Sequence, residues 1–223
     1  MGIGNATEEY EKQTLSLLGL SYKGLKWCEL GNQIRDKKEA AKKAYQSLGV
    51  EHISIDLNGL DGSLLLDLNK PMPFVFLSQF DVVTNYGTIE HINNQYQAFR
   101  NMHDMCKRDG IMLHTLPMED YAYPEHCRYY YSEPFVRDLG NACNYQINNY
   151  NILKHCIAIA YTKKENNDFI SKEEFEQVNG LIDTGDLRRT GDYTKADYNI
   201  LISVVRKLPP PVKWLVRKVL LKK

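Results

Sequence analysis

The sequence lacks long apolar runs and closely paired cysteines, and each absence excludes a class of protein. No apolar run reaches the ~20 residues that a membrane-spanning helix needs, so no such helix is predicted. The five cysteines are scattered and none stands in a C-x-x-C pair, which disfavours zinc ribbons and thioredoxin chemistry. We therefore predict buried, reduced thiols and no metal site.

The chain also lacks an excess of charge of one sign. Its 28 Lys and Arg residues offset 28 Asp and Glu residues, so no overall field draws the protein onto nucleic acid or an acidic surface. Residues 1–9 show neither the cationic start nor the apolar run of a signal peptide, and Ala6 stands where a myristoylation signal needs Ser or Thr. We expect a cytoplasmic protein that does not act on nucleic acid.

What the chain contains is an alternation of short apolar runs and amphipathic segments. Short β-branched or apolar runs predict strands, and apolar residues three and four apart predict helices. The predicted strands are 25–30, 53–57, 64–68 (the weakest), 80–84 and 111–116, and the predicted helices are 7–18 with Thr7 as its cap, 36–48 and 93–107. Such alternation predicts a parallel sheet with helices on both faces and a ligand site at the carboxyl ends of its strands.

The following segment changes this pattern. Residues 134–143 predict a helix, and the strand-like runs 145–152 and 156–161 are close enough to form an antiparallel hairpin. The predicted fold class is α/β: a Rossmann-like, doubly wound, mostly parallel sheet closed by an antiparallel C-terminal hairpin.

We place the main domain at residues 1–163 and a C-terminal extension at 164–223. In the extension, Ser171 and Glu174 have the spacing of a capping box. Residues 180–194 read as loop, 197–208 as helix, and 213–223 as a basic amphipathic tail.

Three carboxylates fall at the predicted carboxyl ends of the first three strands: Glu29, Asp56 and Asp67. A carboxylate there can accept both hydrogen bonds of a ribose diol, or one from an exocyclic amine. Gly31 opens the loop after the first strand, where a glycine lets a ligand approach the backbone closely. Each carboxylate alone could be a solvated turn residue, but three at one edge favour a nucleoside site.

The loop Gly31-Asn32-Gln33 helps to choose the nucleoside. It has one glycine, whereas a dinucleotide site usually seats its pyrophosphate on G-x-G-x-x-G. S-adenosylmethionine has no phosphate and is cationic at sulfur, which suits nearby carboxylates. S-adenosylmethionine is therefore favoured, and an NAD(P)-dependent oxidoreductase stays as an alternative.

Three short sequences carry a resemblance: Cys28-Glu29-Leu30-Gly31, Phe80-Asp81-Val82-Val83 and Ile89-Glu90-His91-Ile92. With them, residues 27–117 resemble the class I S-adenosylmethionine-dependent methyltransferases. The resemblance implies that Asp56 holds the cofactor ribose and that Asp67 and Leu68 lie near the adenine. The cofactor-binding residues implied are Glu29, Gly31, Asn32, Asp56, Leu57, Asp67, Leu68, Asn85 and Tyr86.

The expected activity is methyl transfer to an oxygen or nitrogen of a small molecule or glycan precursor. Such an acceptor needs its proton removed, and histidine suits this with a pKa near ~6.5. The catalytic candidates are His91, His114 and His126, although each could instead be a hydrogen-bonded structural residue. A catalytically inactive, methyltransferase-like binding domain is the other alternative.

Residues 118–131 form a tyrosine-rich segment that we predict to be a loop over the same sheet edge. Tyr123, Tyr129 and Tyr130 are the predicted substrate-binding residues, because aromatic faces can stack on a ring or lie against a sulfonium. Alternatively, the tyrosine-rich segment could simply pack over the protein surface without binding a substrate. The basic tail is expected either to pack as a helix or to contact an anionic membrane surface.

Overall fold

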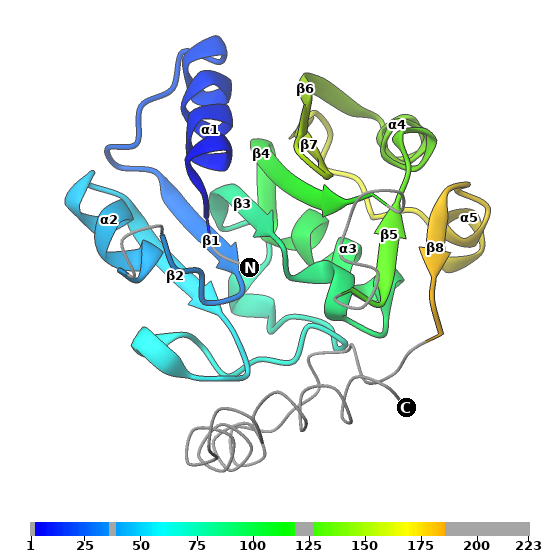
Figure 1. Cartoon of the computed structure of the whole chain (residues 1–223), viewed down its shortest axis with the longest axis horizontal. Helices are drawn as coiled ribbons and strands as arrows, with labels where there is room; N and C mark the ends of the chain where they lie inside the picture. Colours follow the sequence, from blue (N-terminus) through cyan, green and yellow to red (C-terminus); the bar gives the residue numbers. More distant parts are fainter. Residues whose placement is uncertain (1–2, 36–38, 119–126, 186–223) are drawn as a thin grey trace, which may run out of the picture.

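The computed structural model describes residues 3–35, 39–118 and 127–185 (Figure 1). Its main sheet has six strands in the order β2-β1-β3-β4-β7-β6. The first four strands are parallel to one another: β1 (Lys26–Leu30), β2 (Glu51–Ile55), β3 (Phe80–Tyr86) and β4 (Cys106–Pro117). The hairpin β6 (Tyr145–Leu153) and β7 (Cys156–Lys163) is antiparallel and continues the sheet beyond β4. The predicted fold class is confirmed.

Side chains alternate across the strands and thereby define two cores. Trp27 and Val82 are fully buried on the face covered by α1 (Asn5–Leu17) and α2 (Ala41–Ser47). Their neighbours Cys28 and Val83 are buried on the opposite face, with α3 (Gln95–Met105) and α4 (Glu133–Ala142). Burial on both faces explains why the inner strands read as continuous apolar runs.

Helices α1 and α2 begin at other residues than predicted. Helix α1 begins at Asn5 with Gly4 as its N-cap and no side-chain cap, so the prediction of Thr7 as the cap was wrong. Helix α2 begins only at Ala41, because Arg35 is still paired with Ile3 and Ala40 with Ile34 in isolated bridges. None of the helices within the described ranges is both long and apolar enough to cross a membrane.

The strand predicted at 64–68 does not form. Only Leu64 pairs, in an isolated bridge with Ile55, and the connection from β2 to β3 holds two short 3-10 helices, η1 (Leu60–Gly62) and η2 (Phe74–Phe76). Pro71 and Pro73 follow directly and have no N–H to donate to a ladder. As a result β2 is the edge strand, and the loop beyond it folds back over the sheet end.

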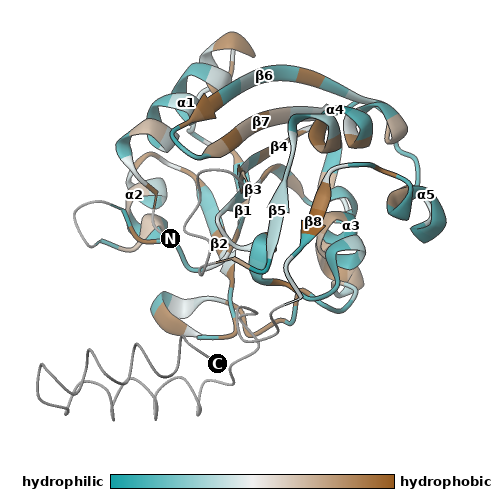
Figure 2. Ribbon diagram, turned by 45° about the vertical axis from the view of Figure 1, so that its right-hand side comes forward, coloured by the Kyte–Doolittle hydropathy of each residue, from teal (hydrophilic) through white to brown (hydrophobic). Residues whose placement is uncertain are grey.

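A second, two-stranded sheet was not predicted. Strand β5 (Tyr129–Tyr131) pairs antiparallel with β8 (Leu181–Asp183), so the loop predictions for 118–131 and 180–194 were wrong at these residues. The two strands lie side by side in both views, and β8 is coloured as hydrophobic in Figure 2. Each is three residues long, too short to show a period of two.

The described part of the C-terminal extension packs on the main domain. Helix α5 (Lys172–Glu176) begins at the capping box of Ser171 and Glu174, which confirms that prediction. Phe169 and Phe175 are buried in the same core as α3 and α4. The helix predicted at 197–208 and the basic tail lie outside the described residues.

Candidate functional site

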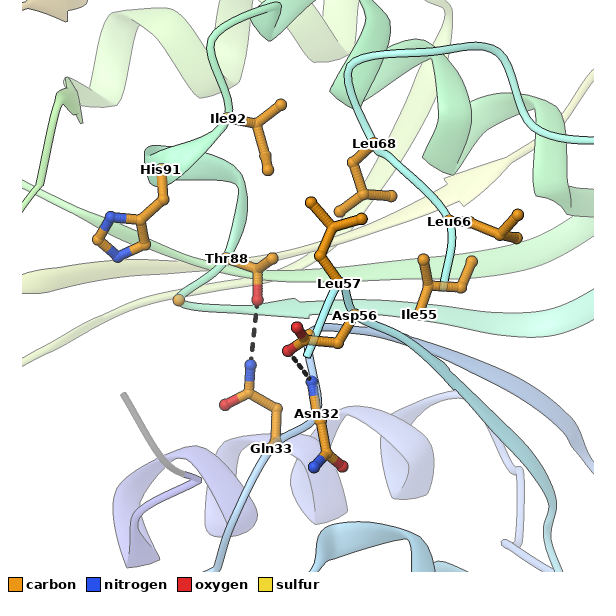
Figure 3. Close-up of a pocket in the computed structure, with 12 residues that line it drawn as sticks. Asn32, Gln33, Ile55, Asp56, Leu57, Leu66, Leu68, Thr88, His91 and Ile92 are labelled. Atoms are coloured by element: carbon orange, nitrogen blue, oxygen red, sulfur yellow. Dashed lines mark hydrogen bonds between the residues drawn. The ribbon is translucent and has the colours of Figure 1, made fainter. Parts of the chain in front are cut away.

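A cleft of about 220 Å³ opens where the parallel strands β1, β2 and β3 end. Leu30 pairs in register with Ile55 of β2 and with Asn85 of β3, so the three carboxyl ends meet at one edge, as predicted. Figure 3 shows side chains that line the cleft. The lining residues are Gly31, Asn32, Gln33, Ile55, Asp56, Leu57, Leu66, Leu68, Gly87, Thr88, His91 and Ile92.

Asp56 is tied to the loop after β1. Its Oδ2 accepts the backbone N–H of Asn32 at 2.8 Å, and its Oδ1 accepts the backbone N–H of Asn58 at 2.8 Å. The N–H of Gly31 donates to the carbonyl oxygen of Ile55, also at 2.8 Å. Each carboxylate oxygen has a further lone pair, so Asp56 can still accept ligand hydroxyls.

Gly31 forms the tightest point of the cleft. Its φ of +82° is one that residues with a side chain rarely adopt. A Cβ there would lie 2.3 Å from Oγ1 of Thr88 and 2.7 Å from Nε2 of Gln33. Nε2 of Gln33 in turn donates to Oγ1 of Thr88 at 3.1 Å, which closes one side of the cleft (Figure 3). This position therefore requires glycine.

The other end of the cleft is apolar. Leu57, Leu66, Leu68 and Ile92 lie on the side away from Gln33 (Figure 3). A site that is apolar at one end and offers a few fixed polar groups at the other is typical of small-ligand binding. The arrangement suits a flat ring joined to a sugar.

Glu29 lies beneath the loop rather than in the cleft lining. Its side chain is fully buried, and burial raises its pKa to about 8. Nε2 of His52 lies 3.7 Å from Oε2 of Glu29, but burial lowers the pKa of His52 to about 4. Both groups are therefore neutral at pH 7, and their contact is not an ion pair.

Three other residues predicted to bind the cofactor also lie outside the cleft lining. Oδ1 of Asn85 accepts the N–H groups of Thr88 and Ile89, at 3.1 and 3.0 Å, and so shapes the turn after β3. The hydroxyl of Tyr86 donates to Glu11 at 2.7 Å, on the face covered by α1. Asp67 accepts the N–H of Asn69 at 2.9 Å within its own turn.

Of the two candidate histidines within the described residues, His91 lines the cleft, from η3 (Ile89–His91), and His114 does not. His114 is buried and stacks on Phe99 with ring centroids 5.6 Å apart, and burial lowers its pKa to about 3. His126 lies outside the described residues.

Two of the three candidate tyrosines, Tyr129 and Tyr130, lie in β5. Tyr129 and Tyr130 are buried, and the hydroxyl of Tyr129 donates to the carbonyl oxygen of Asn93 at 2.9 Å. Tyr123 lies outside the described residues. The segment around Tyr129 is therefore held against the chain that follows η3.

Several cleft residues were not predicted from the sequence: Gln33, Ile55, Leu66, Gly87, Thr88 and Ile92. Thr88 carried a signal, since it follows a predicted strand within the same turn as Asn85. The apolar members carried none, because their place depends on how the loop between β2 and β3 folds back.

The comparisons with known proteins agree with this geometry. Residues 37–114 match a family model described as a methyltransferase domain. No curated protein sequence matches the chain.

Solved structures share the fold at low sequence identity. A Burkholderia thailandensis 1,6-didemethyltoxoflavin-N1-methyltransferase, solved with S-adenosylhomocysteine, has a TM-score of 0.56 at 11% identity over 72% of this chain and 79% of its own. A Listeria monocytogenes protein described as an S-adenosylmethionine dependent methyltransferase has a TM-score of 0.52 at 11% identity, over 71% of this chain and 98% of its own.

A mostly parallel sheet with a cleft at the carboxyl ends of its strands is the arrangement in which open α/β sheets bind ligands. Residues 37–114 therefore match a methyltransferase domain, and the fold is similar to that of S-adenosylmethionine-dependent methyltransferases of known structure.

Proposed function

We propose that the cleft binds S-adenosylmethionine with its ribose on Asp56 and its adenine among Leu57, Leu66 and Leu68. The methionine end would lie along the loop of Gly31 and Asn32. The observation that carries this placement is the Asp56 carboxylate, which lines the cleft and is fixed by the N–H of Asn32 at 2.8 Å. Charge-assisted hydrogen bonds to sugar hydroxyls are among the stronger polar contacts that a protein makes.

The bound cofactor supplies a methyl group that is already activated by its positive sulfur. In the step proposed, the acceptor lone pair attacks the methyl carbon as the carbon–sulfur bond breaks, and the electron pair of that bond stays on sulfur. The acceptor proton passes to a base, for which we propose His91, because it lines the cleft. Alignment of donor and acceptor can lower the barrier by up to ~7–11 kcal/mol in good cases.

The acceptor proposed is an oxygen or nitrogen of a small molecule or glycan precursor. Two observations support it: the zero net charge provides no general attraction to nucleic acid, and one structural neighbour is named as the methyltransferase of a small heterocycle. A catalytically inactive binding domain is a second candidate, favoured by the contact of Gln33 with Thr88 beside Gly31.

Calorimetric titration with S-adenosylhomocysteine tests the cofactor placement. We expect Asp56→Ala to weaken binding by about 10- to 100-fold, because hydrogen bonds to a charged group contribute about 1.5–3 kcal/mol each. Asp67→Asn is the matched control, since Asp67 follows the same strand but lies outside the cleft lining; it should change Kd by less than about threefold.

Equal effects of the two substitutions would contradict the placement of the ribose on Asp56. The thermal midpoints of both variants show whether the loop is still folded. A variant that melts as the wild type does but binds weakly has lost a ligand contact and not its fold.

Methyl-labelled S-adenosylmethionine tests the acceptor class. Incubated with separate metabolite, RNA and protein fractions of a cell extract, the enzyme should label the metabolite fraction only, and His91→Ala should slow that labelling. Labelled RNA would overturn the small-molecule proposal. Cofactor binding without labelling in any fraction would favour the binding-domain alternative.

A further inference from the structure

Glu90, His91 and Cys127 come together beside the cleft although the first two stand far from the third in sequence. One ligand atom from each, a carboxylate oxygen, an imidazole nitrogen and the thiol sulfur, lie within 4.8 Å of one another. Glu90 and His91 belong to η3, and Cys127 stands two residues before β5. These are the three side-chain types that bind zinc most often.

Glu90 is the member whose burial needs explanation. Its side chain is completely buried, and neither carboxylate oxygen has a hydrogen-bond partner among the described residues. A buried carboxylate without a partner is costly unless a positive charge accompanies it, and a divalent cation would supply that charge.

The position of Cys127 is fixed by the residues that follow it. The hydroxyls of Tyr129 and Tyr131 donate to Asn93 and Gln95, at 2.9 and 2.6 Å. Arg128 also contacts the side chain of Asn93 and forms an ion pair with Asp183 of β8 at 2.8 Å. The chain carrying the thiol is thereby held against the chain that follows η3.

We propose that Glu90, His91 and Cys127 form a binding site for a divalent cation of the zinc class. A set of one sulfur, one nitrogen and one oxygen donor suits Zn²⁺ or Co²⁺ and not Mg²⁺ or Ca²⁺, which take oxygen ligands. Tetrahedral ligands ~2.0–2.3 Å from zinc lie roughly 3.3–3.8 Å apart. The three ligand atoms lie within 4.8 Å of one another, so side-chain rotations that bring them about 1 Å closer would complete the geometry.

Three protein ligands leave the fourth tetrahedral position open. His91 also lines the cofactor cleft, so a bound cation would lie at the cleft wall. The open position would suit water or an oxygen, nitrogen or sulfur atom of a bound molecule. This site does not involve Asp56, but it shares His91 with the proposed reaction. The imidazole of His91 cannot act as the base while it binds the cation, so the two roles of His91 are alternatives that cation occupancy decides.

Cobalt titration of the chelator-treated full-length protein tests the proposal without any activity assay. Co²⁺ bound to a thiolate gives a sulfur-to-cobalt charge-transfer band in the near ultraviolet, and tetrahedral Co²⁺ gives intense visible bands. We expect one equivalent of Co²⁺ to produce both, and one equivalent of Zn²⁺ to abolish them.

Three variants identify the ligands. Cys127→Ser should lose the charge-transfer band, and Glu90→Gln, which preserves shape, should weaken Co²⁺ binding at least tenfold. Cys143→Ser is the control, because Cys143 is also a buried cysteine outside any disulfide but lies at the end of α4. This variant should bind Co²⁺ as the wild type does.

The absence of a charge-transfer band in the wild type would overturn the proposal, as would its persistence in Cys127→Ser. Circular dichroism separates loss of a ligand from loss of fold. If Cys127→Ser proves unfolded, the Co²⁺ affinity of Glu90→Gln decides. Co²⁺ binding as tight as that of the wild type would also overturn the proposal.

Discussion

The two oxygens of Asp56 each accept one backbone N–H, so the carboxylate is oriented before any ligand arrives. Such preorganisation reduces the entropy lost on binding. The same two bonds join the loop after β1 to the turn after β2. We therefore expect any substitution that disrupts the conformation of the Gly31 loop to weaken the ribose contact of Asp56 as well.

Substitution of Gly31 by alanine tests the tightest point of the cleft. The new Cβ would lie 2.3 Å from Oγ1 of Thr88 at a φ of +82°, so we expect destabilisation by about 1–3 kcal/mol and at least tenfold weaker S-adenosylhomocysteine binding. Urea denaturation and calorimetry measure the two effects. Gly19→Ala is the control: its φ is +67°, but nothing lies within 4 Å of its Cβ. If both variants bind the ligand equally well, the clash with Thr88 has no role.

Glu29 gives a pH dependence with a definite sign. Its folded pKa of about 8 lies above the ordinary value of 4.5, so between these pH values the folded chain keeps a proton that the unfolded chain releases. Its contribution to stability is complete below about pH 4.5 and is lost as the pH rises to about 8, at up to ~1.4 kcal/mol per pH unit.

Urea unfolding at about pH 5.5 and about pH 7.5 measures this contribution. Relative to the wild type, Glu29→Gln should lose less stability between the two pH values, because glutamine does not titrate. Glu51→Gln, at an exposed position of β2, should keep the wild-type dependence. A wild-type dependence in Glu29→Gln would show that Glu29 does not hold its proton in the fold.

Residue type and strand position were enough to predict Asp56 and Gly31, because the chemistry of both is local. The same reasoning also selected Glu29 and Tyr86, which point to the face covered by α1 and α2. Strand alternation would have distinguished Glu29 and Tyr86 from the cleft residues. Glu29 lies on the same face of its strand as Trp27, and Tyr86 lies on the same face as Val82.

At the scale of elements, the segment between β2 and β3 departs most from expectation. Residues 64–68 have the composition of a strand, yet a strand forms only where a partner satisfies its backbone groups. Here the carbonyl oxygen of Leu64 accepts the N–H of Asp56, and the N–H of Leu64 donates to the carbonyl oxygen of Ser54. The chain then turns away from the sheet edge. Leu66 and Leu68 consequently reach the cleft instead of a sheet face.

Helix α5 is held to the main domain by the aromatic contacts of Phe175, which were not predicted from the sequence. The ring of Phe175 lies 5.8 Å from that of Phe99 and 6.0 Å from that of Phe135, centroid to centroid. We expect Phe175→Ala to cost about 3–5 kcal/mol in urea denaturation, as for other buried phenylalanines.

Phe74 provides the matched control for this substitution. It is 83% exposed, so Phe74→Ala should change stability by less than about 0.5 kcal/mol. Similar losses in the two variants would mean that α5 is not part of the folded core.

At the scale of the whole molecule, the parallel sheet and its closing hairpin were predictable because strand periodicity and short connections are local signals. The β5–β8 pair and the cluster of Glu90 with Cys127 were not, because both join segments distant in sequence. Fold alone does not choose an acceptor, since the same sheet supports many chemistries. The side chains at the carboxyl edge of the sheet determine which acceptor is bound.

A crystal structure with S-adenosylhomocysteine would show where the nucleoside binds. We expect a ribose hydroxyl within about 2.6–3.2 Å of the Asp56 carboxylate and the adenine between Leu57 and Leu68. A nucleoside bound elsewhere, or a ribose with no contact to Asp56, would contradict this expectation.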